Sequence, residues 1–325
     1  MIQLDWRMLA VFCLVGCSAK VVDLDQQPPA MASDDAVVVL TEERASVWVD
    51  EQRLYWVTGF RKIQSCRKTD CAHTLVDYTS SVRGENETVN AVVSGAHVYW
   101  TSTSQNTIYS CPSDGCEPTP RIVTKDPALR SSPFADGDYV YWASAFDIYR
   151  CPAEGCDGAP ELVAADSTAQ AMAFDEQRAY WNDGTRIMSA PKDGSEQAEL
   201  LLDGIDEAQL NLTVGDGALY RSDGKSIFRC AAGNCSASPR APLVTGEGRV
   251  SDIRLDGNKL YWIDADALRS CTLPDCSELF AITPASPIRA VLVGDERFAI
   301  DASDLYWLAP RAQGLAGVEI RRTAK

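Results

Sequence analysis

The chain has 325 residues, of which 46% are hydrophobic, and its 30 Lys and Arg against 46 Asp and Glu give a net charge of −16. So acidic a chain, without a basic run of five or more residues, argues against nucleic acid as a partner and against direct adsorption to anionic lipid. Ten of its twelve cysteines fall in evenly spaced pairs, which argues against a reducing compartment.

Residues 1–16 have the pattern of a secretory signal peptide. Arg7 precedes an apolar run, Met8 to Val15, that is too short to cross a bilayer as a helix. The run ends in Leu14-Val15-Gly16-Cys17, which resembles the lipobox of bacterial lipoproteins. The resemblance implies cleavage before Cys17 and lipidation of Cys17, and more than one acyl chain would anchor the protein durably in a membrane. An ordinary cleaved signal, or a start site assigned too early, is the alternative.

Residues 17–35 follow as a polar segment that contains Pro28-Pro29. We predict a flexible tether there, with a reach on the order of 25 Å. Ser18, directly after the predicted lipidation site, resembles the residue found in lipoproteins sorted to the outer membrane. The expected location is therefore the bacterial cell envelope, at the outer membrane.

Residues 36–325 are predicted to form one domain, because a repeat runs through them. Its marker is a tyrosine that recurs every 39 to 45 residues and is followed by tryptophan in six of seven units, with Arg221 as the exception. The tyrosines are Tyr55, Tyr99, Tyr141, Tyr180, Tyr220, Tyr261 and Tyr306.

Each unit is predicted to contain four short strands. Apolar residues two apart, such as Ile253 and Leu255, indicate a first strand with one buried face, and turns rich in Asp and Gly lead from it to the Tyr-Trp strand. A third strand centred on an aliphatic residue such as Ile148 and a fourth with an apolar pair such as Ile122-Val123 complete the unit. Four strands in about 40 residues are typical of a β-propeller blade.

The count of units predicts an all-β, seven-bladed β-propeller, with six or eight blades as alternatives. The last unit, from Arg297 to Lys325, lacks a fourth strand, whereas Ala36 to Thr41 is a lone strand ahead of the first unit. We expect this N-terminal strand to pair with the last blade and close the ring, because closure removes two open sheet edges.

The paired cysteines are separated by four residues in each of five units. The predicted pairs are Cys66 with Cys71, Cys111 with Cys116, Cys151 with Cys156, Cys230 with Cys235, and Cys271 with Cys276. In the fourth unit Ala190 and Ser195 replace both members, and joint loss is what a local disulfide predicts. Zinc is the rival, but His73 and His97 are the two histidines of the chain and the pairs are spread around a ring, so we predict no metal site.

The repeat resembles the Tyr-Trp-Thr-Asp family of propellers, found in extracellular lipoprotein-receptor modules and in bacterial secreted proteins. The residues that carry the resemblance are Tyr180-Trp181-Asn182-Asp183, Tyr261-Trp262-Ile263-Asp264 and Tyr220-Arg221-Ser222-Asp223. By this resemblance the domain is a propeller and the aspartates tie neighbouring strands together.

Candidate binding residues come from the position nine residues before each repeat tyrosine. The aligned positions are Ser46, Asn90, Ser132, Ala171, Asn211, Asp252 and Arg297. Equivalent positions of different blades converge around the central channel, so we expect these side chains near one mouth of it. Asn90, Asn211, Asp252 and Arg297 are the predicted ligand-binding residues, and Asp252 and Arg297 could form an ion pair. The alternative is that strands begin with polar residues because they meet solvent there.

Sequence motifs of catalysis are missing from the chain. It has no Gly-x-Ser-x-Gly, no paired histidine ligands and no phosphate-binding Gly loop, so no cofactor is expected. We therefore expect a binding or scaffold module of the cell envelope whose partner is a protein or a glycan. An envelope hydrolase or lyase with its site at the channel mouth is the alternative.

Overall fold

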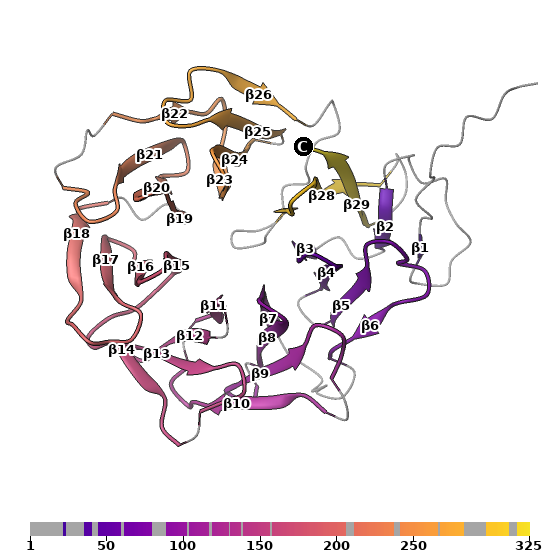
Figure 1. The fold of residues 1–325 in the computed structure, drawn as a ribbon, viewed down its shortest axis with the longest axis horizontal. Helices are drawn as coiled ribbons and strands as arrows, with labels where there is room; N and C mark the ends of the chain where they lie inside the picture. Colours follow the sequence, from indigo (N-terminus) through magenta and orange to yellow (C-terminus); the bar gives the residue numbers. More distant parts are fainter. Residues whose placement is uncertain are drawn as a thin grey trace, which may run out of the picture.

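The strands of the chain form seven sheets arranged as a ring around a central channel (Figure 1). The structure is a computed structural model. It describes residues 22–23, 36–40, 45–59, 62–79, 89–102, 104–116, 119–129, 131–137, 139–156, 158–205, 211–236, 241–265, 267–282, 297–311 and 317–325. All regular elements in these ranges are β-strands. The predicted seven-bladed β-propeller is confirmed.

The first three blades lie in chain order around the ring. They consist of β3 (Ala45–Val49), β4 (Arg53–Thr58), β5 (Lys62–Arg67) and β6 (Val76–Asp77); of β7 (Val89–Ser94), β8 (His97–Ser102), β9 (Thr107–Pro112) and β10 (Arg121–Lys125); and of β11 (Phe134–Asp136), β12 (Tyr139–Ser144), β13 (Asp147–Pro152) and β14 (Glu161–Ala164).

The next three blades repeat this order of strands. They consist of β15 (Ala171–Phe174), β16 (Arg178–Asn182), β17 (Arg186–Pro191) and β18 (Glu199–Asp203); of β19 (Leu212–Gly215), β20 (Ala218–Ser222), β21 (Ser226–Ala231) and β22 (Val244–Thr245); and of β23 (Val250–Asp256), β24 (Lys259–Asp264), β25 (Ala267–Thr272) and β26 (Leu279–Ala281).

The seventh blade is built from both ends of the chain, as predicted. It contains β27 (Phe298–Ile300), β28 (Asp304–Pro310), β29 (Val318–Ala324) and the N-terminal β2 (Ala36–Leu40), which pairs antiparallel with β29. Without β2 the edge of β29 would be unpaired, so this pairing closes the ring.

A short strand outside the predicted propeller domain extends the same sheet. β1 (Val22–Asp23) runs parallel to β2, with Val22 opposite Val38. These two residues belong to the segment predicted as a flexible tether, and period-two patterning gives no signal for so short a strand. The rest of residues 1–35, including Cys17 and the predicted signal peptide, lies outside the described part of the chain.

Tight turns between the first two strands of a blade follow from their Asp-Gly sequences. Asp216 and Gly217, between β19 and β20, have φ of 50° and 68°. A two-residue hairpin of this kind needs left-handed backbone at both positions, which Gly adopts freely and Asp tolerates. The turn thus sets the register in which the Tyr-Trp strand meets the innermost strand.

The core is divided among the seven interfaces between neighbouring blades. Tyr99 of blade two and Trp142 of blade three lie in one buried cluster, and Tyr306 of blade seven and Trp56 of blade one lie in another. All four side chains are at most 1% exposed. Since each interface uses residues from two blades, a blade depends on both neighbours for its burial.

The five predicted disulfides are present, each within one hairpin. They join Cys66 to Cys71, Cys111 to Cys116, Cys151 to Cys156, Cys230 to Cys235, and Cys271 to Cys276. The Cα atoms of each pair are 4.8 to 5.2 Å apart, within the usual range for disulfides.

In the described ranges no helix is long and apolar enough to cross a membrane.

Candidate functional site

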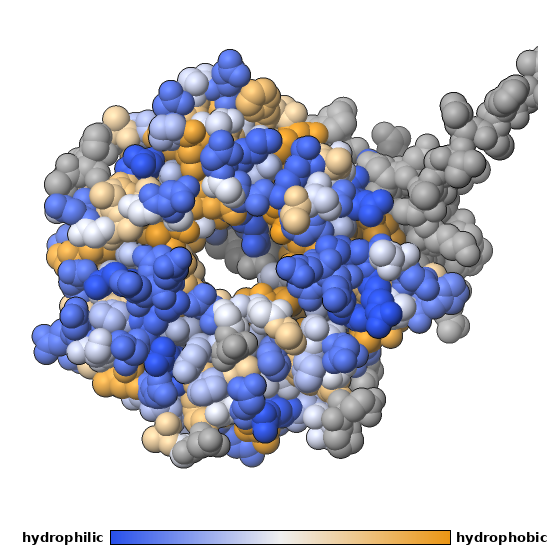
Figure 2. Space-filling view, viewed as in Figure 1, coloured by the Kyte–Doolittle hydropathy of each residue, from blue (hydrophilic) through white to orange (hydrophobic). Residues whose placement is uncertain are grey.

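The innermost strands of the blades surround a cavity on the axis of the ring. The space-filling view shows this open centre, and the cavity has a volume of about 530 Å³ (Figure 2). Its described lining includes residues from all seven blades, mostly from the first strand of each or just before it. A cavity of this size is within the range of small-molecule sites.

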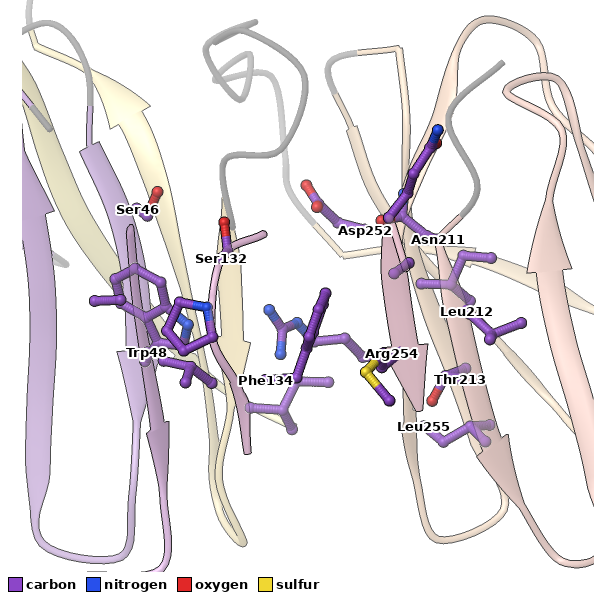
Figure 3. Close-up of a pocket in the computed structure, with 18 of the residues that line it drawn as sticks. Ser46, Trp48, Ser132, Phe134, Asn211, Leu212, Thr213, Asp252, Arg254 and Leu255 are labelled. Atoms are coloured by element: carbon purple, nitrogen blue, oxygen red, sulfur yellow. The ribbon is translucent and has the colours of Figure 1, made fainter. Parts of the chain in front are cut away.

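Polar side chains gather at one level of the cavity. Ser46, Ser132, Asn211 and Asp252 lie toward the same end of the channel, although they come from blades one, three, five and six (Figure 3). Together with Ala171, they are five of the seven positions aligned from the sequence. The alignment therefore identified residues that share the cavity, and we call this level the channel mouth.

The two remaining aligned positions, Asn90 and Arg297, are not among the residues described as lining the cavity. Asn90 lies in β7 opposite Thr101 of β8, and its side chain is outside the described part of the chain. Arg297 directly precedes β27, is 8% exposed and does not belong to the described lining of the cavity. The structure therefore gives Arg297 a supporting place beside the mouth.

Arg297 holds the mouth carboxylate in position. Its Nε donates a hydrogen bond to Asp252 Oδ2 at 2.9 Å, and its Nη2 donates to Ser251 Oγ. Side-chain exposure is 9% for Arg297 and 12% for Asp252. The predicted contact between the two residues is present, and so buried a charged hydrogen bond fixes the direction of the carboxylate.

The backbone of Asp252 is also unusual. Its φ is 51°, and the pairing of β23 with β24 shifts register between Ser251 and Arg254. A left-handed non-glycine residue costs free energy, and a bulge redirects the side chains that follow it. Neither feature has a signal in the sequence, because Asp252 stands in an ordinary polar position of the repeat.

A second level of the cavity was not predicted. Trp48, Phe134, Arg254 and Leu255 lie deeper in the channel than the mouth residues, with Thr213 beside them (Figure 3). Trp48, Phe134, Thr213 and Arg254 each stand two residues after an aligned position. Because side chains two apart share one face of a strand, the period of two was the signal that could have found them.

Charge is sparse on the described lining of the cavity. Asp252 and Arg254 are its two charged residues, and Arg297 faces Asp252. No cluster of three or more His, Cys, Asp or Glu able to hold a metal ion occurs in the ranges that the structure describes. The site can therefore offer hydroxyls, an amide, a fixed carboxylate and, deeper, a guanidinium.

The predicted disulfide cysteines lie apart from this site. Cys116, Cys156, Cys235 and Cys276, like Cys71, follow the third strand of their blade, in the hairpin that leads to the outer strand. None of the ten bridged cysteines belongs to the described lining of the cavity. The bridges therefore join the two arms of each hairpin and leave the channel to other residues.

The chain was compared with known proteins by sequence and by structure, and the structural likenesses concern its fold. No protein-family model and no curated protein sequence matches the chain. A structure of catalytically inactive virginiamycin B lyase from Staphylococcus aureus with quinupristin has a TM-score of 0.60 at 12% identity, covering 88% of this chain and 97% of that one. YCF48 bound to D1 peptide has a TM-score of 0.59 at 14% identity, covering 94% and 98%.

A designed protein is also similar. The computationally designed Ika8 protein has a TM-score of 0.54 at 11% identity, covering 89% of this chain and all of that one (100%). At identities this low the likeness concerns the fold alone, and it does not carry over a ligand or an activity. The chain is thus defined as a seven-bladed β-propeller with disulfide-bonded hairpins.

Proposed function

We propose that the chain is a cell-envelope lipoprotein whose propeller acts as a binding or scaffold module for a protein or glycan partner. The observation that carries the proposal is the channel mouth, where Ser46, Ser132, Asn211 and Asp252 from four separate blades share one end of a cavity. Ser46 and Asp252 lie in strands and Ser132 and Asn211 just before strands, so these groups are held in place and little conformational entropy is lost when a partner binds.

The chemistry of the mouth suits hydroxyl and amide groups. Serine hydroxyls donate and accept, the Asn211 amide does both, and the Asp252 carboxylate accepts. Glycan hydroxyls and peptide N–H groups are matched by this set. The described lining contains no histidine, cysteine or lysine that could serve as base or nucleophile beside Asp252, which favours binding over the alternative of an envelope hydrolase or lyase.

The envelope location rests on the N-terminus and the cysteines. Leu14-Val15-Gly16-Cys17 resembles a lipobox, five disulfides suit an oxidising compartment, and kinship with Tyr-Trp-Thr-Asp propellers would agree with both. Changing Cys17→Ala should abolish acylation and membrane retention and leave the propeller folded. Metabolic labelling with a fatty acid checks this, and wild-type protein that carries no lipid would contradict it.

Partner capture tests the binding proposal. The full chain in detergent is used as bait for cell-envelope extracts, next to the variants Asp252→Ala and Arg297→Ala. Glu196→Ala is the matched control, because Glu196 is an exposed carboxylate in the hairpin between β17 and β18. We expect the control to capture the partner and the two channel variants to lose it.

Two outcomes would change the proposal. Unchanged capture by both channel variants would move the site away from the mouth. Conversion of the captured molecule into a product would favour the hydrolase or lyase alternative.

A further inference from the structure

Arg254 is the basic residue of the described lining of the cavity. Its guanidinium projects from β23 into the cavity at the level of Trp48 and Phe134 (Figure 3). Its Cζ atom lies 5.4 Å from the centre of the Phe298 ring on β27, so the side chain reaches toward blade seven. The bulge between Ser251 and Arg254 locally bends β23, the strand that carries Arg254.

Several apolar side chains line the cavity together with Arg254. Trp48, Phe134, Met172 and Leu255 belong to the described lining of the same cavity. A guanidinium carries five N–H donors, so it can bind a ligand as well as a neighbour within the protein. In a chain of net charge −16, the inner channel thus places a positive charge where an anion could reach it.

The single guanidinium of the inner channel favours a carboxylate over a phosphate as its ligand. A guanidinium presents a planar fork of donors that matches the two oxygens of a carboxylate, and such charge-assisted pairs strengthen where water is scarce. Phosphate carries more charge and more acceptors and is usually met by several donors. One guanidinium among aromatic and aliphatic side chains therefore suits a single carboxylate joined to an apolar body.

We propose that the inner channel binds a carboxylate-bearing apolar ligand, with the carboxylate on Arg254 and the apolar body against Trp48, Phe134 and Met172. This inference rests on the proposed binding function, because it names the ligand chemistry of the same channel. The carboxylate could belong to a free aliphatic acid or to the apolar C-terminus of a peptide. The cavity of about 530 Å³ admits either one.

Binding of defined probes to the full chain in non-ionic detergent tests this inference, with Trp fluorescence and calorimetry as readouts. The acid probes are decanoate and N-acetyl-Leu-Phe with a free carboxylate; the neutral counterparts are decanol and the dipeptide amide. The variant is Arg254→Gln, and Arg121→Gln on the outer strand β10 is the matched control, because Arg121 is exposed and distant from the channel.

Wild type and Arg121→Gln are expected to bind at least one acid probe on the order of ten-fold more tightly than Arg254→Gln does, and the neutral probes should not distinguish the variants. Tighter binding of decanoate would indicate a free acid, and tighter binding of the dipeptide a chain terminus. Equal affinity of wild type and Arg254→Gln, or no acid binding by wild type, would overturn the inference.

A second variant covers the case in which Arg254→Gln unfolds. Thr213→Trp keeps Arg254 and fills the cavity from β19, so it should also abolish acid binding, and unchanged binding would overturn the inference. The two proposals remain separable. Loss of partner capture in Asp252→Ala with no acid binding by wild type would leave the proposed function standing and remove the inner site.

Discussion

In the six repeats that have both, the tyrosine and the tryptophan point to opposite faces of one strand, because side chains alternate along it. Tyr261 is buried against blade seven and Trp262 against blade five. Arg221 takes the place of tryptophan in the fifth unit, with its Cζ 4.1 Å from the centre of the Phe228 ring. A cation–π contact there takes the place of the ring stacking that Trp100 and Trp142 make in blades two and three, which explains how the repeat tolerates the exchange.

Asp301 shows how a single residue links stability to pH. Burial alone would raise the pKa of Asp301, but the Lys68 ammonium at 2.6 Å and the backbone N–H groups of Ser303 and Asp304 lower it from 3.8 to about 2. Because the folded pKa is below the unfolded one, the carboxylate stabilises the fold above about pH 4. This contribution is lost as the pH falls toward 2.

Replacing Asp301→Asn should therefore remove part of the acid sensitivity. The free energy of unfolding, measured by urea titration from pH 5 to pH 2, should fall more steeply for wild type than for the variant. Glu196→Gln is the control, since Glu196 is exposed in the hairpin between β17 and β18. Parallel curves for wild type and Asp301→Asn would contradict the assignment.

Neighbouring blades are tied together by ion pairs between their turns and hairpins. Lys68 of blade one binds Asp301 of blade seven, and Lys192 of blade four binds Asp136 of blade three, both at 2.6 Å. Lys192 Nζ also donates to the carbonyl oxygen of Asp175 in its own blade. These contacts fix how one blade sits against the next.

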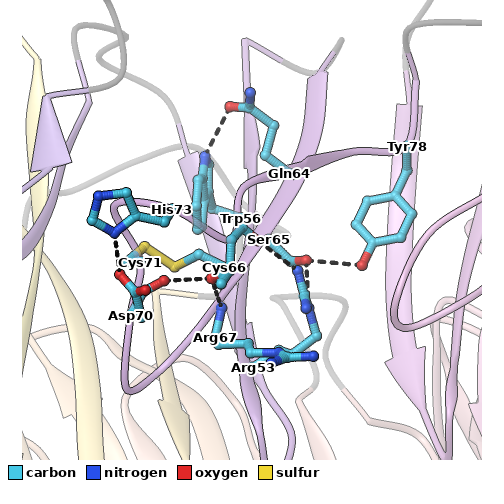
Figure 4. Close-up of a disulfide and its surroundings, with 11 residues drawn as sticks. Arg53, Trp56, Gln64, Ser65, Cys66, Arg67, Asp70, Cys71, His73 and Tyr78 are labelled. Carbon is cyan, nitrogen blue, oxygen red and sulfur yellow. Dashed lines mark hydrogen bonds and ion pairs between the residues drawn. A yellow bond between two sulfur atoms is a disulfide. The ribbon is translucent and has the colours of Figure 1, made fainter.

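Five of the seven units carry a Cys-x4-Cys hairpin. Figure 4 shows the bridge from Cys66 to Cys71 closing one of them. The corresponding hairpin of blade four has no cysteines but has the same turn. Its Gly194 N–H donates to the Pro191 carbonyl oxygen at 3.0 Å, and in blade three the Gly155 N–H donates to the Pro152 carbonyl oxygen at 2.9 Å. The backbone thus keeps its form without the bridge.

A sixth bridge should consequently form in the double variant Ala190→Cys/Ser195→Cys. Closing a loop of this length contributes roughly 2 kcal/mol in the chain-entropy model. Titration of free thiols should find no increase over wild type, and the gain in unfolding free energy should vanish with reductant. Two new free thiols would show that the hairpin geometry differs from its neighbours.

What the sequence predicted follows from local rules. The Tyr-Trp spacing, the Asp-Gly turns and the paired cysteines each act within one unit, so blade number, strand order and disulfides could be predicted from them. The bulge at Asp252 and the contact of Lys68 with Asp301 depend on how two blades pack, and no pattern within a unit encodes that. Arg254 could have been found from its place two residues after the aligned Asp252, but the apolar side chains that share the cavity with it come largely from other blades.

Closure of the ring is a property of the whole molecule. Deleting residues 36–40 removes β2 and leaves β29 with an open edge, so we expect loss of folded monomer and aggregation. Replacing Val22 and Asp23 by Gly and Ser removes only the outer β1 and should leave the thermal transition near that of wild type. A deletion variant that melts like wild type by circular dichroism would mean that β2 is dispensable.

The closed ring also explains why one site can draw on seven blades. The innermost strands begin at the same opening, so side chains as far apart in the sequence as Ser46 and Asp252 share one mouth. The outer strands, by contrast, place apolar residues such as Leu200 and Leu162 on the rim, 52% and 47% exposed. We therefore propose that the partner contacts the mouth.

Site-specific photo-crosslinking in intact envelopes tests that claim most directly. A benzophenone amino acid is placed at Asn211 in the mouth or at Leu200 on the outer strand β18, and irradiated samples are analysed by mass spectrometry. The binding account predicts a covalent adduct with one partner from position 211 and none from position 200. Adducts from position 200 alone would contradict it and place the partner on the rim.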